Sequence, residues 1–173
     1  IWTMGGPTRV GPERGGRAFA AEDMLALVQF PARAHERAMT VLLEKRGEQD
    51  LPEQARGRGR AVAVFEFDAT DAETGEDVGG GEGFDEPAEL TLPYDEANLP
   101  PGTEEGDLVV GFFDEARMRW QAVPPTDVVQ VDLEANTITV RTDHASYWAV
   151  LDGASLAQQD ATATVSRSWG QIK

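Results

Sequence analysis

The chain has 173 residues, enough for one domain of ordinary size with a buried core. Its 40% hydrophobic residues support such a core, while 18 glycines and 10 prolines favour a turn-rich, mainly β architecture over a helical bundle. Cysteine is absent, which excludes disulfides, thiolate metal sites and a thiol nucleophile, and a net charge of −16 argues against binding to nucleic acid or to an anionic membrane surface.

The negative charge is concentrated in one segment. Residues 61–116 carry 17 of the 31 acidic residues and none of the 15 basic ones. Cations or basic protein surfaces are therefore the natural partners of this segment. No stretch approaches the roughly 20 apolar residues that span a bilayer, so we expect no membrane insertion by this chain. The chain begins at Ile1 without a leader pattern, and we expect a processed product or a fragment of a longer protein.

The chain order predicts three parts. Residues 1–16 are rich in Gly and Pro and are expected to form an extended N-terminal arm. Residues 17–151 are expected to form the folded domain. Residues 152–173 are rich in Ala, Ser, Gln and Thr and are expected to form a linker or a donated strand. The strands expected within the domain cover residues 24–30, 38–43, 61–67, 90–93, 108–113, 119–123, 128–131, 137–141 and 146–151.

The connections between these strands are polar and rich in turn-forming residues. Residues 32–36 are compatible with a short turn of helix, and residues 44–60 form a basic loop. Residues 68–83 are acidic and Gly-rich, which predicts a flexible loop, after which Phe84 returns the chain to the core. Short strands at this spacing predict an all-β fold, an antiparallel β-sandwich of about eight to nine strands with extended N- and C-terminal arms.

Several segments together resemble a known family. They are GGRAFAAEDMLALVQFPARA, then FDEPAELTLPYDE, then GFFDEARMRWQAV, and finally VDLEANTITVRTDHASYWAVL, which ends in a closing strand that carries His144 and Ser146. Over roughly residues 15–151 the chain resembles the ZU-five domain of ankyrins, netrin receptors and death-domain scaffolds, which has relatives in bacterial surface proteins. The resemblance implies a β-sandwich that scaffolds or binds other proteins.

Some members of that family cut themselves at a His-Phe-Ser sequence in the closing strand. His144 and Ser146 match this sequence, while Ala145 replaces the Phe. The matched chemistry would have the Ser146 hydroxyl attack the carbonyl of Ala145 with His144 as general base. In a regular strand, however, residues two apart lie about 7 Å from one another, and Asp143 would point to the opposite face, so no Ser/His/Asp triad is expected.

Metal binding is indicated only by an acidic cluster. Calcium prefers several oxygen ligands from such a loop, but the spacing is not that of the twelve-residue calcium loop, so a solvated acidic loop is the competing interpretation. The two His residues, His35 and His144, lie far apart in sequence without a Cys partner and do not predict zinc. No cofactor is expected. The candidate calcium ligands are Asp68, Asp71, Glu73, Glu76 and Asp77.

The two ends of the chain carry apolar residues with little nearby to bury them. Trp2, Val165 and Trp169 are therefore candidate interaction residues, because an extended apolar tail can add a strand to the sheet edge of a neighbour. The sequence predicts a non-enzymatic structural or interaction module of a prokaryotic exported or cell-surface protein, which associates with copies of itself and builds a filament in the sharper form of the hypothesis. The alternatives are self-cleavage between Ala145 and Ser146, or a scaffold domain within a larger protein.

Overall fold

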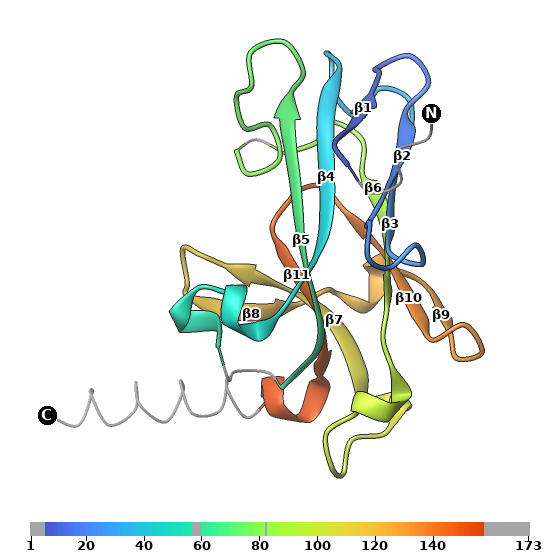
Figure 1. Cartoon of the computed structure of the whole chain (residues 1–173), viewed down its shortest axis with the longest axis vertical. Helices are drawn as coiled ribbons and strands as arrows, with labels where there is room; N and C mark the ends of the chain where they lie inside the picture. Colours follow the sequence, from blue (N-terminus) through green and yellow to red (C-terminus); the bar gives the residue numbers. More distant parts are fainter. Residues whose placement is uncertain (1–5, 57–59, 82, 158–173) are drawn as a thin grey trace, which may run out of the picture.

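The computed structural model describes residues 6–56, 60–81 and 83–157. In this part of the chain the strands form two antiparallel sheets of six and five strands that pack face to face, so the chain is an all-β sandwich, as the sequence predicts (Figure 1). In spatial order, the six-stranded sheet holds β1 (Thr8–Val10), β4 (Met39–Arg46), β5 (Ala61–Asp71), β11 (Tyr147–Asp152), β7 (Leu108–Asp114) and β8 (Arg119–Ala122). The five-stranded sheet holds β2 (Gly16–Phe19), β3 (Leu27–Phe30), β6 (Ala88–Pro93), β10 (Thr137–Thr142) and β9 (Val128–Asp132).

The connections contain short 3-10 turns. These are η1 (Glu48–Asp50), η2 (Glu53–Ala55), η3 (Glu96–Asn98), η4 (Glu105–Asp107) and η5 (Pro125–Asp127). Residues 153–157 add one helical turn after β11. Among the residues placed by the structure, no helix is long and apolar enough to cross a membrane.

The main core lies between the two sheets. Alternate residues of β5 enter it, including Phe65 and Phe67, as expected for a strand with one face toward the core. Phe84 packs against Phe67 and Phe30 with ring centroids 5.9 and 5.0 Å away, which confirms that it returns the chain to the core. Trp148 is also buried in this core.

A second, smaller core covers the outer face of the six-stranded sheet. Trp120 and Leu151 point to this side, and η1, η2 and the turn at 153–157 cover them through Leu51, Ala55 and Leu156. The Trp120 Nε1–H donates a hydrogen bond to the Ala55 carbonyl at 3.2 Å. Because β11 contributes to both cores, its sequence is a continuous apolar run rather than an alternating one.

The N-terminal boundary predicted from the sequence is wrong for the residues that the structure describes. Residues 8–10 of the expected arm form β1 and pair with β4 of the same chain, and β2 follows from Gly16. Gly15 makes the tight turn between them with φ of 68°, and a Cβ at this position would lie 2.1 Å from the Phe30 carbonyl oxygen. These strands are held by tertiary pairing, which a segment rich in Gly and Pro does not reveal.

Three local predictions also need correction. The strand expected over residues 24–30 starts only at Leu27, and both Met24 and Leu25 are exposed. Residues 32–36 form turns and bends rather than helix. At the C-terminal end, Asp152 completes β11, and Leu156 is buried in the second core, so residues 152–157 belong to the folded unit rather than to a linker.

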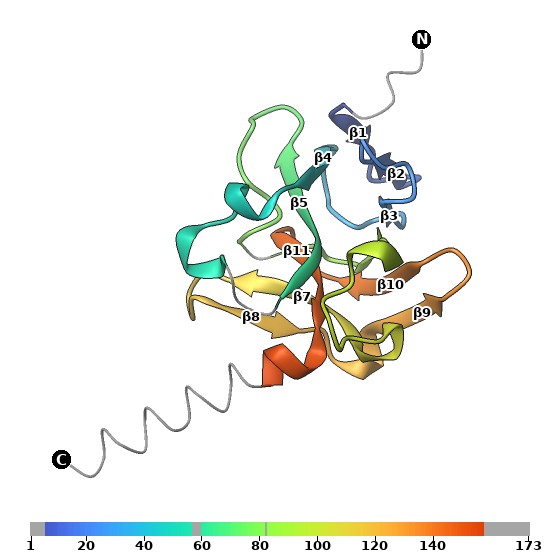
Figure 2. The same cartoon turned by 60° about the horizontal axis from the view of Figure 1, so that its bottom comes forward.

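The last two expected strands, residues 137–141 and 146–151, are present as β10 and β11, but they belong to different sheets. β10 ends at Thr142 in the five-stranded sheet, and β11 begins at Tyr147 in the six-stranded sheet. Residues 143–146, named the crossover below, pass from one sheet to the other (Figures 1 and 2). His144 and Ser146 therefore lie outside any strand.

Candidate functional site

The crossover is held in place by backbone hydrogen bonds to the acidic, Gly-rich loop. The Ala145 N–H donates to the Gly79 carbonyl at 2.8 Å, and the Phe84 N–H donates to the Asp143 carbonyl at 2.6 Å. On the other side, the Phe67 N–H donates to the Ser146 carbonyl at 3.0 Å. The described part of residues 68–83 is thus packed against the crossover, whereas the sequence predicts a flexible loop.

Two glycines of this loop are required by close packing. A Cβ on Gly79 would lie 2.4 Å from the Cβ of Ala145. Gly83 has φ of +81°, and a Cβ there would lie 2.4 Å from the Asp143 carbonyl oxygen. The contact at Gly79 also explains the small residue at position 145, because a larger side chain would meet the Gly79 backbone.

The crossover does not assemble a nucleophile and its base. The Ser146 Oγ–H donates to the Phe113 carbonyl at 3.1 Å, so its proton is directed away from His144. His144 Nδ1 instead lies 3.1 Å from Asp143 Oδ1, which corrects the expectation that Asp143 points to the opposite face. The reason is that residues 143 and 144 form a bend and not a strand. This arrangement provides no base for an attack by Ser146.

The His144 ring has a defined orientation. The Thr142 Oγ1–H donates to the His144 carbonyl at 2.8 Å, which leaves the Thr142 oxygen as an acceptor 3.4 Å from Nδ1. Since Nδ1 faces this oxygen and the Asp143 carboxylate, the ring proton belongs on Nδ1. Phe112 and Trp148 pack against the ring with centroids at 4.5 and 5.2 Å. His144 Nε2 and Trp148 Nε1 are both buried without a hydrogen-bond partner within the described ranges.

Two cavities open beside the crossover. The first has a volume of about 510 Å³ and lies between the sheets, with Phe112 and Trp148 from the six-stranded sheet facing Arg141 and Thr142 from the five-stranded sheet. It is named the mouth cavity below. The second has a volume of about 550 Å³ and borders the Gly-rich loop. Its lining has acidic residues and no Lys or Arg, namely Glu66, Asp68, Asp77, Asp114, Glu115 and Asp143.

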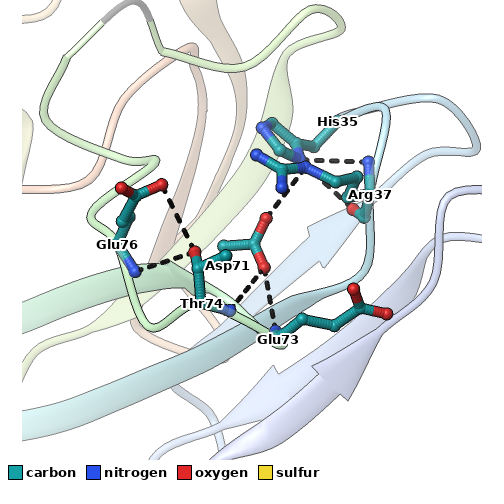
Figure 3. A network of polar contacts seen from close by, with 6 residues as sticks. All are labelled: His35, Arg37, Asp71, Glu73, Thr74 and Glu76. Carbon is teal, nitrogen blue, oxygen red and sulfur yellow. Dashed lines mark hydrogen bonds and ion pairs between the residues drawn. The ribbon is translucent and has the colours of Figure 1, made fainter.

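Three of the candidate calcium ligands, Asp71, Glu76 and Asp77, make contacts within their own loop. Asp71 is buried at the end of β5, where its Oδ1 accepts the N–H groups of Glu73 at 2.8 Å and Thr74 at 3.0 Å (Figure 3). Its Oδ2 lies 3.0 Å from Arg37 Nε. The N–H groups of Thr74 and Glu73, followed by the charge of Arg37, hold the pKa of Asp71 below its usual value. Glu76 turns to the Thr74 hydroxyl instead.

The remaining carboxylates do not complete a metal site. Asp77 Oδ1 accepts the N–H groups of Gly79 and Gly80 at 3.0 and 3.1 Å, so it stabilises the turn of the Gly-rich loop. Asp68 lies in the acidic lining of the second cavity. Over residues 6–56, 60–81 and 83–157, no group of three or more acidic or His side chains is placed to hold a metal ion.

The edge strand β9 was predicted as a strand, but its exposure was not foreseen. Val128, Val129 and Val131 are 38 to 53% exposed, and Leu133 in the following turn is 53% exposed. β9 pairs with β10 on one side only, because it is the last strand of its sheet. The signal available in the sequence was three valines within four residues. Of the predicted interaction residues, Trp2, Val165 and Trp169 lie outside the described residues.

Comparison with known proteins adds no identification. No protein-family model matches the chain, and no curated protein matches it. The resemblance to the ZU-five domain therefore remains a prediction from the sequence.

Proposed function

We propose that this chain is a non-enzymatic interaction module of a prokaryotic exported or cell-surface protein, and that it associates with other copies of itself. The observation that carries this proposal is β9, an edge strand with apolar side chains left in solvent. An edge strand offers unpaired N–H and C=O groups to an incoming strand, and natural proteins usually protect such edges with charges, proline or β-bulges. The first four residues of β9, VVQV, include no charge and no proline, and the strand has one register shift relative to β10, at Val129.

Val128 and Val131 of β9 lie on the side of the sheet that faces the core, while Val129 is left unpaired at a register shift. Val131 pairs with Ile138 and Val128 pairs with Val140, and residues directly opposite one another in a sheet share a face. Ile138 is 3% exposed, whereas Val131 is 53% exposed. The six-stranded sheet therefore covers the inner face of β10 but leaves the same face of β9 exposed to solvent. An exposed apolar surface of this kind is typical of a site where another protein binds.

Charge supports self-association as well. The segment before residue 61 holds ten Lys or Arg against eight acids, whereas residues 61–116 hold only acids. Opposite surfaces of two copies can thus attract one another, and this attraction weakens as salt is added. The hydrogen bonds of the crossover support a non-enzymatic role, because the Ser146 hydroxyl donates its hydrogen bond to the Phe113 carbonyl and not to a general base.

The test is sedimentation velocity of the intact chain over a range of concentration and salt. We expect dimers or larger species that grow with concentration and shrink at high salt. A chain that sediments as a monomer at every concentration would refute self-association and would favour the alternative of a scaffold domain within a larger protein.

A further inference from the structure

The sandwich is open at the end where β9 lies. Val131 faces the same side as the buried Ile138 but has no opposing layer, and the mouth cavity opens beside Asp127, the residue that precedes β9. Aromatic rings of Phe112 and Trp148 line the inner part of this cavity. The cavity therefore opens next to the start of β9.

An occupant of this open end must satisfy three conditions. It needs an extended backbone to pair with β9, apolar side chains on one face to cover Val131 and fill the cavity, and a positive charge, because three carboxylates and one guanidinium line the cavity. The carboxylates are those of Asp85, Asp127 and Asp143, and the guanidinium is that of Arg141.

The C-terminal sequence meets these conditions. Residues 161–169 read ATATVSRSW, without Gly, Pro or an acidic residue. In an extended strand, alternate side chains share a face, so Val165, Arg167 and Trp169 would face one side. The other side would carry only hydroxyl side chains, which suits a surface exposed to water. These hydroxyl residues are Thr162, Thr164, Ser166 and Ser168.

The folded part of the chain ends at a different place from β9. The turn covers the outer face of the six-stranded sheet through Leu156, whereas β9 is the edge of the other sheet. Both views place the turn and β9 on different sides of the molecule (Figures 1 and 2). The proposed self-association therefore favours the tail of a second copy as the occupant.

We propose that residues 161–169 of one copy pair antiparallel with β9 of a second copy, with Val165 opposite Val131 and Trp169 entering the mouth cavity near Asp127. This inference rests on the proposed function and names the surfaces that self-association uses. Each copy has one tail and one open edge at different places, so the contact is head-to-tail. Such a contact builds a chain of subunits unless its rotation closes a ring.

The direct test uses the absence of cysteine from the chain. Full-length Val131→Cys and full-length Val165→Cys are mixed in a glutathione redox buffer, and the products are separated without reduction. We expect a mixed disulfide dimer well above that formed by Leu25→Cys with Val165→Cys, since Leu25 is similarly exposed but lies before β3.

Other products would overturn the proposal in recognisable ways. Val131→Cys dimers that exceed the mixed product would indicate pairing of β9 with β9. A cross-linked monomer from the double variant, Val131→Cys with Val165→Cys, would show that the chain's own tail is the occupant. A mixed product at the level of the Leu25→Cys control would exclude the tail from this edge.

Sedimentation separates this inference from the proposed function. We expect Val131→Lys to weaken self-association about tenfold or more, because a charge at the centre of an apolar contact stays partly desolvated, while Leu25→Lys leaves it unchanged. If the wild-type chain associates and Val131→Lys associates equally well, the proposed function stands and the use of β9 is refuted. If the wild-type chain is monomeric, both fail.

Discussion

The two buried tryptophans offer a matched test of the polar contacts around the crossover. Trp120 and Trp148 are each 1% exposed and sit in the cores on opposite faces of the six-stranded sheet. They differ in one respect: the Trp120 Nε1–H donates to the Ala55 carbonyl, whereas Trp148 Nε1 has no partner within the described residues. Replacing each by Phe removes the same atoms from similar surroundings.

The expected losses follow from these contacts. The lost ring atoms cost about 2 kcal/mol of unfolding free energy in either variant, at roughly 0.8 kcal/mol for each buried carbon-sized group. Trp120→Phe also breaks a hydrogen bond and leaves the buried Ala55 carbonyl unpaired, which adds about 1 to 2 kcal/mol. Trp148→Phe removes an unpaired donor and regains about 1 to 2 kcal/mol. Trp120→Phe should therefore be the less stable variant by about 3 kcal/mol.

The assay is urea unfolding at neutral pH, followed by far-UV circular dichroism. The comparison is valid where both variants keep the wild-type slope, so that a shift in midpoint reports stability. Equal destabilisation of the two variants would refute the reasoning, because it would mean that the Trp148 N–H has a partner in solution.

Four further outcomes are expected. The pKa of Asp71 is lowered, so the ionised carboxylate stabilises the folded chain at neutral pH, and this stabilisation is lost as the pH falls below the usual Asp value near 3.8. Asp71→Asn should make the urea midpoint depend less on pH in this acidic range. Burial and a hydrogen bond to a carboxylate raise the pKa of Tyr94 to about 12, so the folded chain loses stability from about pH 10 to pH 12, and Tyr94→Phe abolishes this loss. Calcium and EDTA should leave the thermal midpoint unchanged, because Asp71 and Asp77 already accept backbone N–H groups. Intact mass spectrometry should show one undivided chain for the wild type and for Ser146→Ala; two fragments from the wild type alone would establish self-cleavage.

The strands that the sequence predicts well are those with a strong local pattern. β6, β10 and the second half of β5 alternate apolar and polar residues, and this pattern follows directly from having one face in the core. β1 and β2 escape prediction because they are short and flanked by Gly and Pro. β1 is stabilised by pairing with β4, which is distant in sequence, and β2 by pairing with β3. A local pattern of apolar residues reveals neither pairing.

Which sheet a strand joins is a different kind of information. The apolar pattern of residues 137–151 says which side chains are buried, but not which strands lie next to them. β10 and β11 are separated by only the crossover, yet β10 pairs with β6 and β9 while β11 pairs with β5 and β7. The sequence therefore predicts the two strands but not that they belong to different sheets, and it wrongly places His144 and Ser146 in the closing strand. The geometry of His144 and Ser146 follows from that change of sheet and was out of reach of the pattern.

The glycines of residues 68–83 show why composition misled the interpretation of this loop. Gly is favoured both in mobile segments and wherever two backbones approach closely, and sequence alone does not separate the two uses. At Gly79 the second use applies, since its Cα position faces the Cβ of Ala145 and its carbonyl accepts the Ala145 N–H. The same contact accounts for the missing Phe of the His-Phe-Ser pattern, because a ring at position 145 would occupy the space of the loop. The residues of the crossover therefore pack against the Gly-rich loop. The exposed apolar surface that a partner could bind is the edge of the sandwich at β9.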